Sequence, residues 1–247
     1  MRLLIESSLP LNPAAAGGSV VRVYPVAVDK DIKTQLWFYR LAQFVLFSLY
    51  RILFDYKVYG TENVPEDSRA VIFAPNHASN LDPPIVGMTL KTPTHYYARD
   101  YLFKVFGLGT ALTWLGTLPI KGDGTDFHSV RQMLRALKEG KRLVIFPEGT
   151  RSADGELHEA EGGTGFLAIN SKAYVVPVYI QGTYEAYPRS AKFFRCKPVR
   201  VYFGKPFIPA EDPEVMAAAD PYLATGRRIM AEIKRMKGST TILSGKK

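Results

Sequence analysis

Residues 70–84 read AVIFAPNHASNLDPP, an apolar run that leads into a short polar segment with one histidine and one aspartate. The apolar part, 70–74, is typical of a buried strand. Pro75 cannot donate a ladder hydrogen bond and pushes its neighbour towards extended geometry, so we expect the strand to stop there. His77 is therefore predicted to lie in a loop at the carboxyl end of a strand, where loops commonly carry chemistry.

His77 and Asp82 are the residues of this segment that could move a proton together. Histidine titrates near neutral pH and can take a proton from an alcohol. If the loop folds back, Asp82 can accept from one ring nitrogen, which fixes the tautomer and leaves the other nitrogen for a substrate hydroxyl. Asp82 followed by Pro83 is also typical of an ordinary helix start, with a capping aspartate and an early proline. Both roles are compatible, since a carboxylate has two oxygens.

Four blocks of the sequence, in order, resemble the glycerolipid acyltransferases. Residues 76–82 show the pattern Asn-His-x-x-x-x-Asp, and residues 146–151 read FPEGTR. Residues 99–120 resemble the second motif of that family, and residues 176–178 resemble its fourth. The resemblance covers about residues 58–209 and is closest to the bacterial 1-acylglycerol-3-phosphate acyltransferases. Four ordered blocks are far more specific than one short pattern.

The resemblance implies transfer of a fatty acyl group from an acyl thioester to the free 2-hydroxyl of lysophosphatidic acid, giving phosphatidic acid. His77 would be the general base and Asp82 its orienting partner. Six residues are expected to bind the phosphate and glycerol of the substrate: Arg99, Lys121, Glu148, Gly149, Thr150 and Arg151. Three further residues are expected to support the motifs: Asn76, Pro147 and Pro177. Acyl-CoA or acyl carrier protein would supply the acyl group as co-substrate, and we expect no other cofactor and no metal.

The FPEGTR segment has residue types that suit a phosphate, because Gly149 lets the backbone approach a ligand and Arg151 can contact two phosphate oxygens. The alternative is a plain turn closed by a pair between Glu148 and Arg151. Two positions depart from the family pattern. Lys121 stands near a place where the family tends to have arginine, and Glu161 stands where it often has a basic residue. A carboxylate cannot bind phosphate directly.

The composition fits a globular chain with anionic partners. A length of 247 residues can hold one large α/β domain with an appendage, and 47% apolar residues is ordinary for a globular core. The net charge of +9 favours phosphate-bearing substrates, anionic lipid surfaces, an acidic carrier or nucleic acid. No recognisable nucleic-acid module occurs, so we expect no such partner. The single cysteine, Cys196, excludes a disulfide within this sequence, which suits a reducing cytoplasm.

The most apolar stretch, residues 36–54, predicts a membrane-interface helix. Its length of about 28 Å as a helix nearly matches a bilayer core. Lys33, Arg40 and Arg51 recur after nearly whole turns, which predicts a basic stripe opposite a broad aromatic face. Because an arginine in mid-segment argues against spanning, we expect a monotopic helix on the cytoplasmic face of an anionic cell membrane. A core-packing helix and a transmembrane span are the alternatives. Residues 1–5 are too short an apolar run for a secretory signal.

From residue 56 onward, short apolar runs alternate with helical stretches, which predicts an α/β fold with one mixed or parallel sheet covered by helices. The runs that read as strands are 56–59, 70–74, 95–98, 117–120, 143–146, 175–180 and 199–203. The predicted helices are 84–90, 102–113, 126–139, 163–171 and 219–236. The predicted regions are an unclear N-terminal extension (1–30), the membrane-interface segment (31–55), the acyltransferase domain (56–237) and a flexible tail (238–247).

Some alternatives stay open at this point. The acceptor could be glycerol 3-phosphate or another lysophospholipid, since the same pair of residues would serve. The basic segment 192–200 motivates a different class, a non-catalytic protein that binds anionic surfaces. Four aromatic residues could line a groove for an acyl chain or belong to an ordinary core: Phe103, Phe106, Trp114 and Phe166. Ser79 is a poor nucleophile candidate because no GxSxG segment surrounds it.

Overall fold

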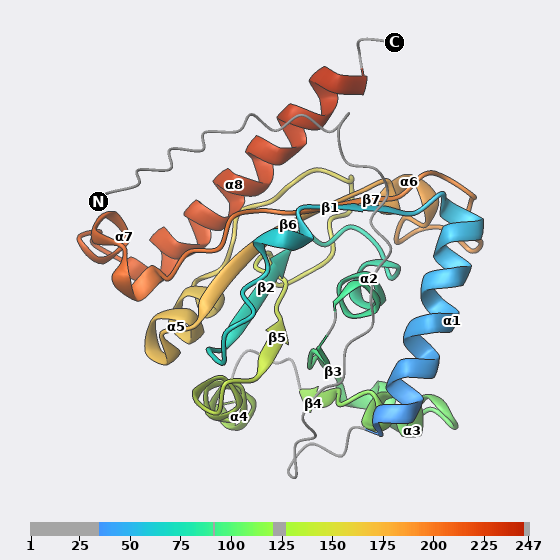
Figure 1. The fold of residues 1–247 in the computed structure, drawn as a ribbon, viewed down its shortest axis with the longest axis horizontal. Helices are drawn as coiled ribbons and strands as arrows, with labels where there is room; N and C mark the ends of the chain where they lie inside the picture. The colour runs from blue at the N-terminus through green and yellow to red at the C-terminus, as the bar shows by residue number, and fades with distance from the viewer. Residues whose placement is uncertain (1–34, 91, 121–126, 245–247) are drawn as a thin grey trace, which may run out of the picture.

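The computed structural model of the chain describes residues 35–90, 92–120 and 127–244 (Figure 1). A central five-stranded sheet has the order β1-β7-β6-β2-β5. Its strands are Lys57–Tyr59 (β1), Val71–Pro75 (β2), Arg142–Val144 (β5), Tyr174–Gln181 (β6) and Arg200–Phe203 (β7). Neighbouring strands are parallel except β6 and β7, which are antiparallel. The predicted α/β fold with a mixed sheet is confirmed.

Two of the predicted strands lie outside this sheet. β3 (Tyr97–Arg99) and β4 (Leu118–Ile120) form a separate parallel pair. A single parallel bridge from His95 to Leu143 links this pair to the edge of β5. The expectation of one continuous sheet is corrected to this extent, because β5 is only three residues long and offers little edge for pairing. The parallel bridge still gives β3 the same direction as β2 and β5.

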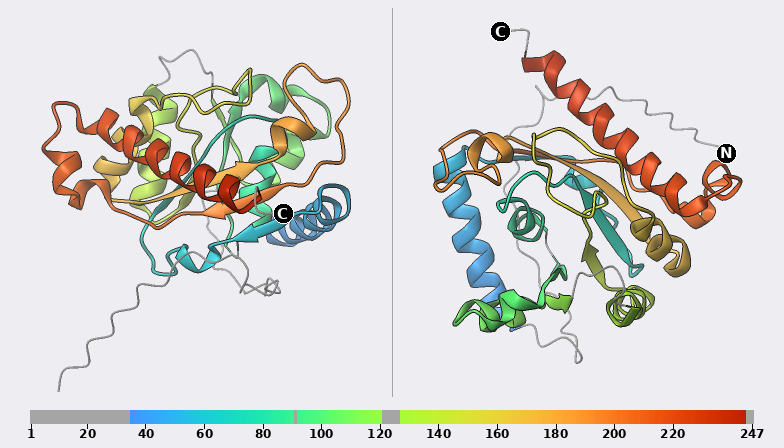
Figure 2. Two further views of the ribbon diagram at one scale, coloured as in Figure 1. Left: turned by 90° about the horizontal axis from the view of Figure 1, so that it is seen from above. Right: turned by 180° about the vertical axis from the view of Figure 1, so that it is seen from behind.

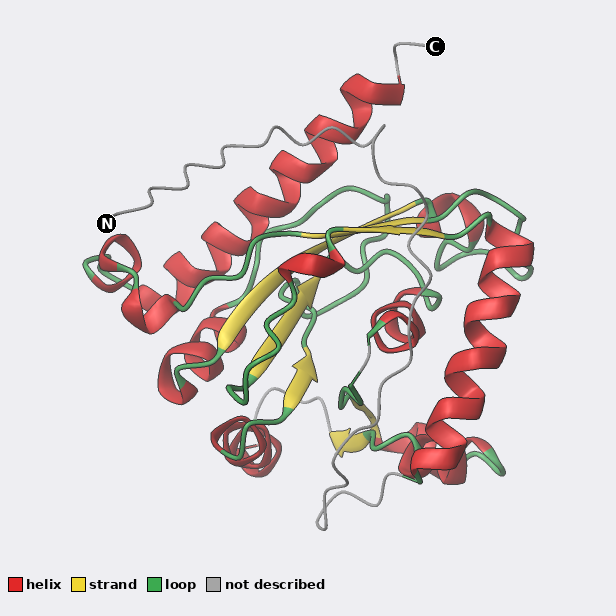
Figure 3. Cartoon of the chain, viewed as in Figure 1, coloured by secondary structure: helices red, strands yellow, loops and turns green. Residues whose placement is uncertain are grey.

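Helices cover both faces of the sheet (Figures 1 and 3). One face packs against α1 (Leu36–Phe54) and α2 (Asp82–Thr89), and the other packs against α4 (Phe127–Lys138), α5 (Gly162–Ser171) and α8 (Pro221–Ser244). The right view of Figure 2 likewise shows the strands between α1 and α8. Further helical elements are η2 (Thr61–Asn63), η3 (Asp100–Lys104), α3 (Leu108–Trp114), α6 (Thr183–Ala186), η4 (Pro209–Glu211) and α7 (Pro213–Met216).

Two predicted helices differ from those observed. The single helix expected over 102–113 is instead η3 followed by α3, because Gly107 has a φ of 75° that interrupts a right-handed helix. The last helix, α8, continues through Gly238 to Ser244, so the flexible tail expected from residue 238 is helical for most of its length. The N-terminal extension, residues 1–30, lies outside the described residues.

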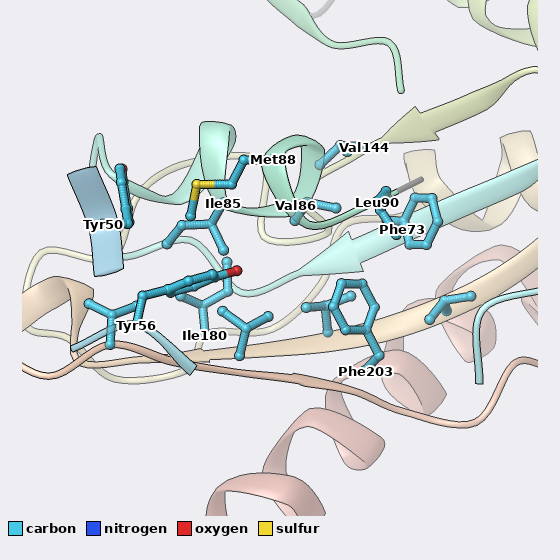
Figure 4. Close-up of a cluster of buried hydrophobic side chains, with 14 of the residues drawn as sticks. Tyr50, Tyr56, Phe73, Ile85, Val86, Met88, Leu90, Val144, Ile180 and Phe203 are labelled. Carbon is cyan, nitrogen blue, oxygen red and sulfur yellow. The ribbon is translucent and has the colours of Figure 1, made fainter. Parts of the chain in front are cut away.

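The apolar run that precedes His77 is a strand buried on both faces. Alternate side chains of β2 enter different cores: Val71 and Phe73 belong to one, and Ile72 and Ala74 to the other. Figure 4 shows Phe73 among side chains from α2 and from neighbouring strands. A strand covered on both sides must be continuously apolar, which explains the sequence of this run. The residues that follow β2 are therefore held by both halves of the core.

α1 matches the predicted helix 36–54 and is apolar on two sides. Tyr39, Tyr50 and Phe54 are buried against the domain. The predicted aromatic face is therefore largely an inward face. A second set of apolar side chains points away from the domain, and at least two-fifths of each is exposed: Trp37, Leu41, Phe44, Val45, Leu49 and Ile52. We call this set the outer stripe. No helix in the described ranges is long and apolar enough to cross a membrane.

Two glycines of α5 offer a matched test of the packing of α5 against α8. A Cβ at Gly165 would lie 2.2 Å from the carbonyl oxygen of Tyr222 in α8, whereas one at Gly163 would meet nothing within 4 Å. We expect Gly165→Ala to lower the free energy of unfolding by about 1–3 kcal/mol, as overpacked sites do. Gly163→Ala should leave it unchanged or raise it by up to about 1 kcal/mol. Urea unfolding of both variants makes the comparison, and equal effects would contradict the close approach of α5 and α8.

Candidate active site

The carboxyl ends of β2 and β5 bring two sequence motifs together. Because these strands are parallel neighbours, the segments that leave them meet at one edge of the sheet. His77 follows β2, and the FPEGTR segment follows β5. Arg151 Nη1 donates a hydrogen bond of 2.8 Å to Asn80 Oδ1, which joins the two motifs directly. The alternative, a turn closed by a pair between Glu148 and Arg151, is not found among the ion pairs of the described residues.

His77 and Asp82 form the expected pair. His77 Nδ1 lies 2.9 Å from Asp82 Oδ2. The same oxygen accepts backbone hydrogen bonds of 2.7 Å from Ala78 and of 2.7 Å from Ser79. An oxygen that accepts hydrogen bonds from two amides also accepts one from the ring. Nδ1 is therefore the ring nitrogen that carries the proton, and Nε2 has a free lone pair. The His77 side chain is 15% exposed, so a ligand can reach the ring.

Three contacts fix the His77 ring and backbone. The ring stacks on Phe146, with 3.9 Å between centroids and 22° between planes. The backbone amide of His77 donates to Glu148 Oε1 at 2.9 Å, and the His77 carbonyl accepts from the Ser152 amide at 2.7 Å. All three partners come from the segment after β5. The position of the imidazole therefore depends on both motifs.

Glu148 is buried and holds two loops together. Its Oε1 accepts from the His77 amide, and its Oε2 accepts from the His158 amide at 3.0 Å. Burial raises the pKa of Glu148 above its ordinary value, and the two backbone hydrogen bonds oppose this only in part. The expected contact between Glu148 and substrate stays a prediction. Both oxygens are occupied by amides, and only 4% of the residue is exposed.

Asn76 continues the pairing of β2 with β6 past Pro75. Its Nδ2 donates to the carbonyl oxygen of Ile180 at 3.1 Å, and its Oδ1 accepts from the Ile180 amide at 2.7 Å. The side chain thereby imitates a strand residue where proline has removed a donor. Pro177 pairs with Ala74 inside β6. Pro147 is buried, and its carbonyl accepts a hydrogen bond of 2.8 Å from the Glu161 amide.

The turn at Gly149 presents charges of both signs. Gly149 is exposed, with a φ of 68° that favours glycine, and Thr150 beside it is exposed. A Cβ built on Gly149 would lie 2.7 Å from Glu161 Oε1, so the Glu161 carboxylate rests against this turn. Arg151 follows one residue further along. A ligand at this turn would therefore meet a guanidinium, a carboxylate and bare backbone.

Two other predicted cationic residues are placed only in part. Arg99 ends β3 and is exposed, at the carboxyl end of a strand that runs parallel to β4. It shares the strand direction of the segments that carry His77 and Arg151. Lys121 lies outside the described residues. The two expectations for phosphate binding by Arg99 and Lys121 stay predictions.

The aromatic residues proposed for an acyl-chain groove separate into two places. Phe103, Phe106 and Trp114 line an open recess of about 430 Å³ together with Phe38 of α1. Phe166 instead packs in the core beneath α8, with its ring 5.5 Å from Tyr222. Of the two alternatives, groove or ordinary core, Phe166 thus fits the core. Within the described ranges no group of three or more His, Cys, Asp or Glu side chains could hold a metal ion.

Residue types and spacings carry no signal for several contacts of the site. The amides of Ser152 and His158 are backbone partners, which residue types do not reveal. The Tyr50 hydroxyl donates to the carbonyl of Leu81 at 2.9 Å and links α1 to the residue just before Asp82. Ser79 Oγ is buried and donates to the Tyr187 carbonyl at 2.6 Å. Such partners lie far away in the sequence and only the fold brings them together.

A helix-covered α/β sheet with these motifs at its carboxyl edge defines the class of the protein. The chain belongs to the acyltransferase family, whose model, described as Acyltransferase, matches residues 55–181. That segment contains both the histidine–aspartate pair and the FPEGTR turn. The resemblance to glycerolipid acyltransferases found in the sequence is confirmed.

Several named proteins are similar to this chain. The 1-acyl-sn-glycerol-3-phosphate acyltransferase of Bacillus subtilis is 31% identical over 157 residues, which covers 63% of this chain and 75% of the relative. The chloroplastic LPAT1 of Arabidopsis thaliana is 27% identical over 175 residues, which covers 70% of this chain but only 47% of the plant protein. The crystal structure of the LPA acyltransferase PlsC from Thermotoga maritima has a TM-score of 0.66 and 25% identity, covering 80% of this chain and 77% of that one.

The pKa of Glu148 gives a pH test of the site. Because burial raises this pKa above its ordinary value of 4.5, the folded chain binds the proton more tightly than the unfolded chain does. The contribution of Glu148 to the free energy of unfolding is therefore largest below pH 4.5, and it is lost as the pH rises through the raised pKa. We expect the free energy of unfolding to fall in this window for the wild type and not for Glu148→Gln.

Urea unfolding over a series of pH values measures this difference. Glu159→Gln, which removes an exposed carboxylate close by, is the matched control and should keep the wild-type slope. Parallel curves for the wild type and Glu148→Gln would show that the pKa of Glu148 is not raised on folding.

Proposed function

We propose that the protein transfers a fatty acyl group from an acyl thioester to the 2-hydroxyl of lysophosphatidic acid, giving phosphatidic acid and a free thiol. The observation that carries the proposal is the 2.9 Å contact between His77 Nδ1 and Asp82 Oδ2, with Nε2 left free on a reachable ring. Names of relatives in bacteria and plants support lysophosphatidic acid as the acceptor. Either acyl-CoA or acyl carrier protein would serve as the thioester.

The proposed reaction needs one base and no enzyme-bound acyl group. Nε2 of His77 takes the proton of the acceptor hydroxyl as its oxygen attacks the thioester carbonyl carbon. The new C–O bond forms, the C–S bond breaks, and the thiolate receives the proton from the imidazolium. Asp82 keeps the ring in the required tautomer and stabilises the positive charge that forms on it. Ser79 takes no part as a nucleophile, since its hydroxyl is buried and bonded to Tyr187.

The acceptor phosphate would lie at the turn beside this pair. Arg151 is held near the catalytic loop by Asn80, and Gly149 allows close approach of the backbone. Thr150 is exposed at the same turn. Arg99 and Lys121 follow from the family resemblance as further phosphate ligands. These assignments place the phosphate a short distance from the hydroxyl that reacts.

A second acceptor class is favoured by one observation, the Glu161 carboxylate against Gly149. A carboxylate repels a phosphate dianion but attracts an ammonium group. A lysophospholipid or lyso-aminolipid whose head group carries a cation would suit a turn with both Arg151 and Glu161. A panel of acceptors separates the two candidates: lysophosphatidic acid, glycerol 3-phosphate, lysophosphatidylethanolamine and a lyso-aminolipid.

His77→Ala tests the chemistry. Loss of a general base should lower turnover by about 10²–10⁴-fold or more. Release of free thiol from acyl-CoA and from acyl carrier protein, with and without lysophosphatidic acid, is the measurement. His128→Ala changes an exposed histidine on α4 and should keep the wild-type rate. Near-normal thiol release from His77→Ala would reject the mechanism, and release that needs no acceptor would reject acyl transfer.

The outer stripe of α1 is proposed to lie in the interfacial region of an anionic membrane, on its cytoplasmic face. Phe44 and Ile52 are 71% and 80% exposed, an unusual state for such large apolar side chains when they share one helix face. Arg51 follows Phe44 by seven residues and so lies at nearly the same angle, where it could reach lipid phosphates. This places a monotopic helix beside a site whose proposed substrate and product are lipids.

Replacing both Phe44 and Ile52 by serine should weaken binding to mixed phosphatidylglycerol and phosphatidylcholine vesicles. The expected loss is about 3 kcal/mol or more, since each such side chain contributes about 1.5–3 kcal/mol when buried. Vesicle sedimentation measures the binding. The control is Phe127→Ser with Val130→Ser on α4, which removes exposed apolar side chains well away from α1 (Figure 1). Equal binding by the two double variants would count against docking through α1.

A further inference from the structure

The loop that follows α6 combines exposed aromatic rings with unopposed positive charge. Residues 188–198 read PRSAKFFRCKP, with four cationic side chains and no acidic one. We call this segment the basic loop. Phe193 is 83% exposed and Phe194 is 51% exposed. Two adjacent phenylalanines in solvent are unusual on a soluble surface and indicate a surface that something covers.

The cations of the basic loop are available to a partner. None of them forms an ion pair with any residue of the described part of the chain: these are Arg189, Lys192, Arg195 and Lys197. Each is exposed. Within a segment that carries no acid, the four charges reinforce one another and attract an anionic surface.

The basic loop is anchored at its base to the end of α1. The Phe194 ring lies 5.8 Å from the Phe54 ring, and the Val199 amide donates to the Phe54 carbonyl at 2.8 Å. Within the loop, the Arg195 amide donates to the Ala186 carbonyl at 2.7 Å. Figure 1 shows α6 and the loop beside the C-terminal end of α1. The loop is thus held against Phe54, the last residue of α1.

The loop also begins at the catalytic segment. Tyr187, the residue before it, accepts a hydrogen bond of 2.6 Å from Ser79 Oγ. Ser79 in turn donates its amide to Asp82, the partner of His77. The residue just before the basic loop, Tyr187, is therefore in direct contact with the histidine–aspartate segment. Whatever the loop binds is held close to the candidate active site.

We propose that the basic loop is a second membrane anchor, in which Phe193 enters the interfacial region of an anionic bilayer and the four cations contact lipid phosphates. A lipid surface fits better than a nucleic acid or an acidic protein for two reasons. The exposed rings lie at the C-terminal end of α1, the helix that carries the outer stripe. The rings also sit among cations, the arrangement of interfacial anchors, where apolar residues enter the acyl boundary beneath charged head groups.

Two anchors fix an orientation that one helix cannot. A helix lying in the interface leaves the domain free to roll about the helix axis. Contact of the basic loop at the C-terminal end of α1 removes that freedom. This proposal goes beyond the proposed reaction and does not depend on it, because binding to vesicles is measured without substrate.

The single cysteine provides a reporter in the full chain. Cys196 is exposed and lies within the basic loop, so an environment-sensitive thiol dye labels this loop alone. We expect a blue shift of the dye with equimolar phosphatidylglycerol and phosphatidylcholine vesicles and little shift with phosphatidylcholine alone. Double-stranded DNA and acyl carrier protein serve as anionic probes without a bilayer. A dye that responds to either of them and not to anionic vesicles would overturn the proposal.

Charge and ring variants test the anchor by vesicle binding. Lys192→Gln with Lys197→Gln should weaken binding to the anionic vesicles by about 20–30-fold, since one cation near the surface contributes a factor of about five. The control is Lys138→Gln with Lys234→Gln, which lowers the net charge equally on α4 and α8. Phe193→Ser should weaken binding about tenfold, compared with Phe127→Ser on α4.

The comparison of loop and control variants decides the outcome. Loop variants that bind as the controls do would show that net charge alone attracts the membrane, and the proposal would be wrong. The variants of Phe44 and Ile52 test α1 separately. If a basic-loop variant loses the dye shift while α1 is unchanged, the loss is due to the basic loop alone. Circular dichroism checks that each variant is folded, and no core residue is changed.

Discussion

One carboxylate oxygen, Oδ2 of Asp82, holds the catalytic segment in shape. It accepts from the His77 ring and from the amides of Ala78 and Ser79. Hydrogen bonds to a charged group contribute about 1.5–3 kcal/mol each, so three of them offset much of the penalty for burying this carboxylate. The other oxygen, Oδ1, is buried without a hydrogen-bond partner among the described residues. The three hydrogen bonds to Asp82 therefore all lie on Oδ2, the oxygen that contacts the His77 ring.

Asp82 Oδ2 can accept these three hydrogen bonds only because β2 fixes the position of the segment that follows it. The strand is buried on both faces, and Asn76 carries its pairing with β6 one residue further. Glu148 then holds the His77 amide from the neighbouring β5. A site supported by rigid elements and by a second layer of hydrogen bonds keeps its geometry to within a fraction of an ångström. In the proposed reaction His77 would need such support, because proton transfer depends steeply on distance.

Local patterns predicted the elements that depend on nearby residues. The helix 36–54 and the pairing of His77 with Asp82 follow from periodicity and from a spacing of five residues. The function of Glu148 could not be predicted, because it depends on amides that come from other segments of the chain. The predicted aromatic face of α1 did not separate the side chains that meet the domain from those that point outward. A helix that is apolar on two sides has no periodicity that tells which side meets the core.

Polar contacts of α1 determine which of its two apolar sides meets the domain, since apolar periodicity alone does not. The Tyr50 hydroxyl bonds to Leu81, Gln43 Nε2 donates to the Leu90 carbonyl at 2.7 Å, and the Tyr39 hydroxyl donates to the Gly87 carbonyl at 3.3 Å. Burial first and the charge of Asp82 second raise the pKa of Tyr50, so the hydroxyl remains a donor. Rotating α1 to bury the outer stripe would break all three bonds and leave buried polar groups unsatisfied. The helix therefore keeps its tyrosines on α2 and its outer stripe away from the domain, although both sides are apolar.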